Sequence, residues 1–193
     1  MKRFKSASEI RSACIGYGPT CNMGKLHFSY MIEAGIKPVA VCDVNQEALE
    51  TAKKDFPDID VYSSADEMLN REDINLVTVI LPHNLHSEFV IKCLNAGKNT
   101  VVEKPMAITT KECDKMMAAA KKNKCLLSVF HNRHWDPFII TAVDMVKKQK
   151  LIGDIIRINA HLGGYNCPGE EWRSSKSISG GILYDMGAHI LEY

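Results

Sequence analysis

Short apolar runs alternate with helical segments through the first 130 residues, and this alternation limits the possible folds more than any other feature of the chain. The clearest run is 76–81 (Leu-Val-Thr-Val-Ile-Leu), and a second lies at 38–43. Both are continuous rather than alternating, as expected for strands that are covered on both faces. Strands that alternate with helices form βαβ units with right-handed crossovers. We therefore predict an α/β fold with a parallel sheet.

The predicted elements divide the chain at about residue 130. In the first part we expect strands at 11–16, 38–43, 60–62, 76–81, 100–103 and 125–130, and helices at 24–34, 46–55, 86–96 and 109–123. The last of these helices begins with a capping box, Thr109-Thr-Lys-Glu112. After residue 130 we expect an amphipathic helix at 137–150, an alternating strand at 154–162 and a loop at 163–179. The predicted domains are thus 1–130 and 131–193.

Composition excludes several classes of protein. The chain has 193 residues, 46% of them apolar and 24% charged, which is ordinary for a soluble globular protein. A net charge of +1 gives no basic field, so we expect neither nucleic acid nor a membrane as a partner. Seven cysteines without a C-x-x-C pair favour a reducing compartment, and no signal peptide is evident at the basic start. We therefore expect a cytoplasmic protein.

A glycine loop joins the first predicted strand to the first predicted helix. In Gly16-Tyr17-Gly18 the glycines allow the backbone to approach a pyrophosphate at a helix N-terminus. The next glycine is Gly24, so the spacing is G-x-G-x5-G. A P-loop is excluded because Leu26 stands where that motif needs a hydroxyl. An ordinary turn that happens to hold glycines remains an alternative.

Asp43 ends the second predicted strand, where an acidic side chain binds the ribose hydroxyls of a dinucleotide. Its charge would repel a 2′-phosphate, which favours NAD over NADP. A strand-end or helix-cap carboxylate is the alternative role for this residue. The order of strand, glycines, helix, strand and acid favours nucleotide binding, with Gly16, Tyr17, Gly18 and Asp43 at the cofactor.

Ligands of an open parallel sheet bind beyond the carboxyl ends of its strands, which directs attention to two further loops. Pro82 and His86 follow the fourth strand, and Glu103 and Lys104 lie at the end of the fifth. His86 could contact a ligand or pack against the sheet at the start of a helix. Lys104 precedes a proline that ends the strand, so it could meet the contents of the cleft or lie in solvent.

Paired histidines invite a metal interpretation, which we do not favour. His83 with His86 and His131 with His134 both lack the cysteine or carboxylate ligands that would complete a site. We therefore predict no metal.

Asp185 and His189 are four residues apart, so on one helix they would lie on the same face. A lysine, a carboxylate and an imidazole can together oxidise an alcohol when a hydride acceptor is nearby. The alternative is an acidic residue favoured by the helix dipole, followed by a solvent-exposed histidine.

Together these motifs resemble the Gfo/Idh/MocA family, which includes glucose–fructose oxidoreductase and inositol dehydrogenase. The resemblance extends from about residue 13 to residue 189. It rests on the glycine loop, Asp43, Pro82-x-x-x-His86, Ala96-Gly97-Lys98, Glu103-Lys104-Pro105, Asn132-Arg133, Trp172-Arg173 and Gly180-Gly181-x-x-x-Asp185-x-Gly187-x-His189. It implies a Rossmann dinucleotide-binding domain followed by an α+β domain with an open antiparallel sheet. Two departures are an insertion at 19–22 in the glycine loop and a second domain that is incomplete, as in a C-terminally truncated chain.

The resemblance also implies an activity and its residues. The activity is NAD(P)-dependent hydride transfer to or from a sugar or polyol, with NAD preferred to NADP; the alternative is a catalytically inactive sensor or regulatory module, or a truncated remnant. Lys104, Asp185 and His189 would be catalytic. Gly16, Tyr17, Gly18, Asp43, Pro82, His86, Glu103 and Lys104 would border the cofactor, and Arg133, Trp172 and Arg173, with Tyr165 and Asn166, would meet the substrate. An incomplete sheet in the second domain would favour a homo-oligomer.

Overall fold

A computed structural model describes residues 4–18, 22–161, 163–164 and 172–192 of the chain. Its contacts divide the chain into two compact units, Met1–Val129 and Phe130–Tyr193. The first unit is thus described over 4–18 and 22–129, and the second over 130–161, 163–164 and 172–192.

The described residues of the first unit form a sheet in the strand order β3-β2-β1-β4-β5-β6. The five strands from β3 to β5 are mutually parallel, which confirms the predicted α/β fold. The strand order reverses at β1, because β2 and β3 lie on one side of it and β4 and β5 on the other. Ligands of doubly wound sheets bind at this reversal. The strands are β1 (Arg11–Ile15), β2 (Lys37–Cys42), β3 (Asp60–Tyr62), β4 (Leu76–Val79), β5 (Asn99–Glu103) and β6 (Leu127–Phe130).

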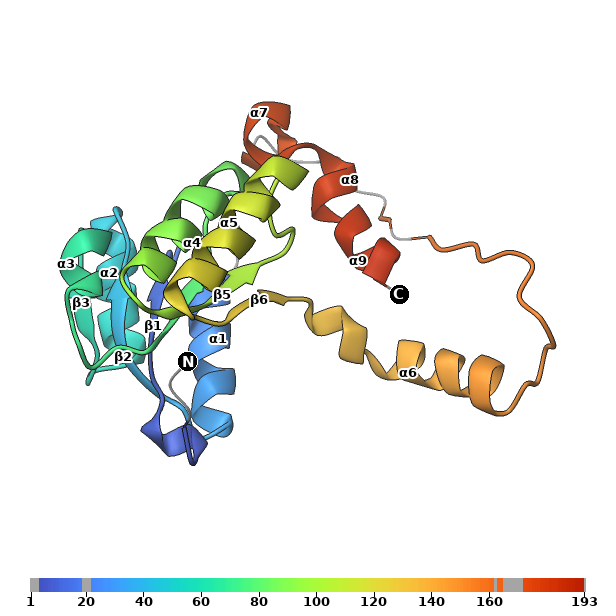
Figure 1. The fold of residues 1–193 in the computed structure, drawn as a ribbon, viewed down its shortest axis with the longest axis horizontal. Coiled ribbons are helices and arrows are strands. Elements are labelled where there is room, and N and C mark those ends of the chain that lie inside the picture. Colours follow the sequence, from blue (N-terminus) through green and yellow to red (C-terminus); the bar gives the residue numbers. More distant parts are fainter. Residues whose placement is uncertain (1–3, 19–21, 162, 165–171, 193) are drawn as a thin grey trace. The chain divides into compact units, whose positions relative to one another are not determined.

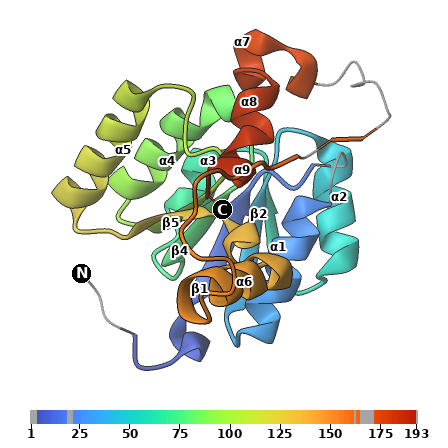
Figure 2. The ribbon, with the colours of Figure 1, turned by 90° about the vertical axis from the view of Figure 1, so that its right-hand side faces the viewer.

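Helices cover both faces of this sheet (Figures 1 and 2). On one face, α1 (Met23–Glu33) and α2 (Gln46–Asp55) enclose a core that includes Cys14 and Val41. On the other face, α3 (Ala65–Leu69), α4 (His86–Asn95) and α5 (Thr110–Asn123) enclose a core that includes Ile15 and Val79. Neighbouring residues of β1 thus enter different cores, which explains why its last three residues, Ala13–Ile15, are apolar without alternation.

Local signals in the sequence set several helix ends. The side chain of Asn45 accepts hydrogen bonds from the backbone of Glu47 and Ala48 at the start of α2. Thr109 and Glu112 form the predicted capping box at the start of α5. Gly97, with a φ of 74°, follows the end of α4. The helices predicted at 46–55 and 109–123 are therefore confirmed.

The described part of the second unit is helical. Its helices are α6 (Pro137–Val143), continued by a π-helical turn at Asp144–Lys148, α7 (Lys176–Ser179), α8 (Ile182–Asp185) and α9 (Gly187–Glu192), with 3-10 turns at Asn132–Trp135 and Trp172–Ser174. The helix predicted at 137–150 is present, although its last turn is of the π type. The loop predicted at 163–179 contains α7 and a 3-10 turn where it is described; Tyr165, Asn166 and the insertion residues 19–21 lie outside the described residues.

The strand predicted at 154–162 is wrong for the residues described. Residues 155–161 form neither helix nor strand and are exposed, while Leu162 lies outside the described residues. A strand satisfies its backbone groups only by pairing, and apart from Phe130 in β6 no described residue of the second unit belongs to a strand. Among the described residues of the second unit, 154–161 therefore have no strand beside them with which to form a ladder.

Candidate active site: a glycine loop, a Glu-Lys-Pro segment and an Asp-His pair

Gly16 lies where β1, β2 and β4 come together. Its φ is +90°, a conformation that favours glycine, and a Cβ at this position would overlap the carbonyl oxygen of Ile80. The Gly16 amide donates a hydrogen bond of 2.8 Å to the carbonyl oxygen of Cys42. No larger residue can therefore occupy the turn without displacing the end of β4. At Gly18 no atom lies within 4 Å of an added Cβ, so open space remains above the loop.

Tyr17 anchors the loop between α1 and α2. Its side chain is buried, and its hydroxyl donates a 2.7 Å hydrogen bond to Asp55, which also accepts one of 2.6 Å from Lys25. Burial, followed by the bond to Asp55, raises the pKa of Tyr17, while the bond from Lys25 lowers the pKa of Asp55. A Cβ on Gly24 would overlap the Tyr17 ring. Gly24 therefore makes room for this ring.

Asp43 stands at the carboxyl end of β2 and holds the glycine loop by its side chain. Its Oδ2 accepts hydrogen bonds from the amides of Tyr17 (2.8 Å) and Gly18 (3.2 Å), and its Oδ1 accepts one of 2.9 Å from the Asn45 amide. A carboxylate has about four acceptor positions, so about one remains for a further donor. The side chain thus stabilises the loop and places a negative charge beside Gly18.

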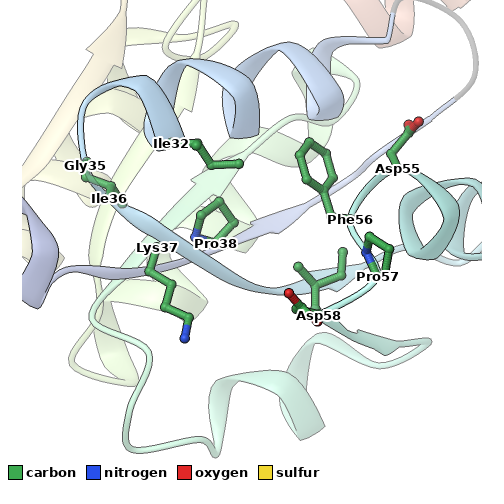
Figure 3. A pocket seen from close by; sticks show the side chains of 10 residues that line it. Ile32, Gly35, Ile36, Lys37, Pro38, Asp55, Phe56, Pro57 and Asp58 are labelled. Carbon is green, nitrogen blue, oxygen red and sulfur yellow. The ribbon is translucent and has the colours of Figure 1, made fainter.

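Two hollows lie at opposite ends of β2. The smaller, of about 150 Å³, lies beside the glycine loop and is lined by Tyr17, Gly18, Asn22, Glu47, Ala48 and Thr51. The larger, of about 380 Å³, lies near the amino end of β2 (Figure 3) and is lined by Ile32, Gly35, Ile36, Lys37, Pro38, Asp55, Phe56, Pro57, Asp58 and Ile59. Because ligands of this fold bind at the carboxyl ends of the strands, the smaller hollow marks the nucleotide side.

The loop after β4 leads to a buried histidine at the start of α4. Pro82 precedes a 3-10 turn, His83–Leu85, and accepts a 2.9 Å hydrogen bond from the Leu85 amide. His86, the first residue of α4, is fully buried; its Nδ1 lies 2.9 Å from the Pro105 carbonyl oxygen and its Nε2 lies 2.8 Å from that of Leu81. Burial lowers its pKa. Both ring nitrogens thus face backbone carbonyls, the packed arrangement of the two that the sequence allowed.

Glu103 connects the end of β5 to α1. Its Oε1 lies 2.8 Å from Nε2 of His27, and its Oε2 accepts a 3.1 Å hydrogen bond from the Lys104 amide. The Lys104–Pro105 peptide bond is cis. Sequence reasoning did not single out His27, although a signal exists, because it shares the buried face of α1 with Gly24 and Phe28. A histidine on such a face needs a buried hydrogen-bond partner.

In the second unit, Asp185 lies beside a residue that was predicted to meet the substrate. Nε of Arg173 is 3.5 Å from the Asp185 carboxylate, and the Arg173 guanidinium stacks 4.5 Å from the centre of the Trp172 ring. Asp185 and His189 are both buried. They do not share one helix as predicted, since α8 ends at Asp185 and α9 begins at Gly187.

Three further basic side chains of this unit lie close to carboxylates. Arg133 lies 3.7 Å from Asp136, an i,i+3 ion pair. His131 and His134 lie 3.3 Å and 2.7 Å from the Glu192 carboxylate. Within the described ranges, no three histidine, cysteine or acidic side chains are grouped so that they could hold a metal ion.

Comparison with known families gives the relationship of the chain. Residues 10–131 match the family model described as an oxidoreductase family with an NAD-binding Rossmann fold, and residues 140–193 match the GFO/IDH/MocA C-terminal domain. The chain belongs to the Gfo/Idh/MocA oxidoreductase family. Its first unit is accordingly the Rossmann domain of an NAD-binding family, as the resemblance implied.

Individual members of the family extend the comparison. Scyllo-inositol 2-dehydrogenase (NADP(+)) IolW of Bacillus subtilis is 32% identical over 100% of this chain and 52% of its own length. An NAD-binding protein from Listeria innocua has a TM-score of 0.86 at 30% identity, covering 95% of this chain and 53% of that one. Myo-inositol 2-dehydrogenase from Lactobacillus plantarum has a TM-score of 0.68 at 29% identity, over 76% and 43%. The chain thus spans about half the length of its curated relatives.

The residues of this Gfo/Idh/MocA chain fit the dinucleotide that its family binds. Open space at Gly18 and the adjoining hollow lie beside the Asp43 carboxylate, which has about one acceptor position left for a ribose hydroxyl. Lys104 belongs to the first unit, whereas Asp185 and His189 belong to the second. In the part of the chain that the structure describes, no helix is long and apolar enough to cross a membrane.

Proposed function

We propose that this chain takes part in NAD-dependent oxidation of a cyclic polyol or a related sugar hydroxyl. The observation that carries the proposal is that the glycine loop, Asp43 and Glu103-Lys104 all stand at the carboxyl ends of parallel strands. The names of two relatives, a scyllo-inositol and a myo-inositol 2-dehydrogenase, support the substrate class. When bound, the dinucleotide would supply the hydride acceptor, and the carbinol would give a hydride to it and a proton to the protein as it becomes a carbonyl.

The protein residues handle the proton and the developing charge. His189 accepts the hydroxyl proton, a task suited to imidazole because its ordinary pKa lies near neutrality. Lys104 donates a hydrogen bond to the same oxygen and stabilises its negative charge. Asp185, beside Arg173, orients His189 or a second substrate hydroxyl. Arg133 and Trp172 contact the remaining hydroxyls of the ring.

The first prediction concerns Lys104 and His189. We expect NADH binding by fluorescence titration and NAD-linked turnover with a panel of inositols and sugars. His189→Ala should lower kcat by about 10²–10⁴-fold, the usual value of a general base, and Lys104→Ala by a comparable factor. The matched control is Lys111→Ala, since Lys111 is exposed on α5. NADH binding without turnover on any substrate of the panel would favour a sensor instead.

The second prediction concerns the choice of cofactor. The carboxylate of Asp43 beside Gly18 disfavours a 2′-phosphate, although IolW is named as an NADP(+) enzyme. Because Asp43→Asn removes this charge, the ratio of the NADPH to the NADH dissociation constant should fall by about tenfold. The ratio is the measured quantity, since asparagine keeps only one of the two acceptor oxygens that serve the Tyr17, Gly18 and Asn45 amides, and this loss weakens both complexes. An unchanged ratio would remove Asp43 from cofactor selection.

A further inference from the structure

Two buried histidines contact the two residues that flank Lys104 in the sequence. Nε2 of His27, on α1, lies 2.8 Å from Oε1 of Glu103, the residue before the lysine. Nδ1 of His86, on α4, lies 2.9 Å from the carbonyl oxygen of Pro105, the residue after it. The two histidine residues are 3% and 0% exposed, so neither is available to a ligand from solvent.

Glu103, which contacts His27, also accepts a hydrogen bond from the backbone of Lys104. Glu103 uses one oxygen for His27 and the other for the Lys104 amide, 3.1 Å away. The imidazole therefore fixes the rotation of the carboxylate that in turn holds the lysine backbone. The rest of the buried face of α1, Gly24, Phe28 and Met31, is small or apolar. Burying a polar ring there costs free energy unless it is hydrogen-bonded, so the position is specialised for this contact.

The contact from His86 joins two strand ends. Its Nε2 faces the Leu81 carbonyl after β4, while its Nδ1 faces the Pro105 carbonyl after β5. A neutral imidazole has one N–H, so it donates to only one of these carbonyls at a time. Burial lowers the pKa of His86, which favours the neutral ring. Variants that keep only one of the two nitrogens can therefore tell to which carbonyl the ring donates its hydrogen bond.

We infer that His27 and His86 are positioning residues that hold Lys104 from both sides, so that its ammonium group reaches the nicotinamide end of a bound dinucleotide. The inference rests on the proposed function and assigns two residues that do not touch the reacting atoms. His27 also lies on the helix that follows the glycine loop, so α1 connects that loop with Glu103, the residue before the lysine.

The test compares NADH with ADP-ribose, which lacks the nicotinamide. In the unmodified chain, saturating NADH should protect Lys104 from acylation by an N-hydroxysuccinimide ester, read by peptide mass spectrometry, and ADP-ribose should not. His27→Leu should abolish this protection at saturating NADH and weaken NADH binding by about tenfold. ADP-ribose affinity should stay within about twofold, because the glycine loop is unchanged.

Conservative variants separate positioning from packing. The amide nitrogen of glutamine can replace Nε2 of a histidine, and that of asparagine can replace Nδ1. His27→Gln should therefore restore protection of Lys104 by NADH. His86→Asn should keep it, because it retains the donor toward Pro105, whereas His86→Gln should lose it. The matched control is His161→Gln, since His161 is exposed.

The outcomes distinguish the inference from the function on which it rests. If NADH protects Lys104 equally in the unmodified chain, His27→Leu and His86→Gln, the positioning role is wrong while dinucleotide binding stands. The positioning role is also wrong if NADH and ADP-ribose binding weaken by the same factor in His27→Leu. If the unmodified chain binds neither ligand, the proposed function fails and the inference fails with it. Should His27→Leu not fold, the His86→Asn and His86→Gln pair decides.

Discussion

At the scale of single residues, the two loop glycines differ in backbone conformation and in the space around them. Gly16 has a φ of +90° and no room for a Cβ beside the Ile80 carbonyl, whereas Gly18 has a φ of +37° and open space. Gly16→Ala should therefore lower the free energy of unfolding by about 2–4 kcal/mol, from strain and overpacking together. Gly18→Ala should cost about 1 kcal/mol. Urea unfolding measures both, and equal losses would contradict the geometry at Ile80.

The sequence predicts a residue's role when its neighbours in the chain determine that role. The turn at Gly16 and the strand-end position of Asp43 follow from the order of strand, glycine and acid. The role of Gly24 does not, because it depends on where the Tyr17 ring packs. Likewise, the partner of His27 is Glu103, which lies far along the chain. A polar residue on an apolar helix face is the available signal, but it does not name the partner.

At the scale of elements, Asp73 joins the start of β1 to the segments that flank α3. It accepts hydrogen bonds of 2.9 and 2.8 Å from Arg71 and one of 3.1 Å from Arg11, while Arg71 also donates to Asp60 at the start of β3. The bonds from Arg71, the larger effect, and from Arg11 hold the pKa of Asp73 well below its ordinary 3.8. The Asp73 carboxylate thus links β1, through Arg11, to β3, through Arg71.

This depressed pKa gives a stability that depends on pH. Since the folded-state pKa is the lower one, the contribution is complete above pH 3.8 and is lost as the pH falls through the folded-state pKa. Asp73→Asn should cost about 1 kcal/mol at pH 7, because solvent screens a side chain that is about a third exposed. The deficit should shrink below pH 4 in urea unfolding, with Asp114→Asn, exposed on α5, as the control. A deficit independent of pH would contradict an electrostatic origin.

The same scale shows which elements a sequence can predict. The central strands β1, β2 and β4 are largely buried, and helices α2 and α5 carry their own caps, so local sequence suffices for these elements. Residues 155–161 have an equally clear alternation but form no strand, because pairing needs a partner elsewhere. The helix expected through Asp185 and His189 is interrupted before Gly187, where a Cβ would crowd the Leu183 side chain. Glycine is also a poor helix former.

At the scale of the whole molecule, the two units differ in how their backbones are protected. The first has a sheet with helices on both faces, whereas residues 154–161 of the second are exposed and without helix or strand. Proteases cut where the backbone is exposed and locally unstructured. Trypsin should therefore cleave after Lys150 or Arg157 at least about tenfold faster than after any lysine or arginine of residues 22–129.

The measurement is a time course of limited proteolysis read by mass spectrometry. Arg157→Gln should slow release of the fragment that begins at Ile158 without protecting Lys150. The nicked chain should retain its NADH affinity, because the loop, Asp43 and Glu103 all precede the cut. If Arg157 instead resists trypsin as well as the first unit does, residues 154–161 are paired in solution. The alternating sequence would then be paired as a strand, and this pairing would contribute to the stability of the second unit.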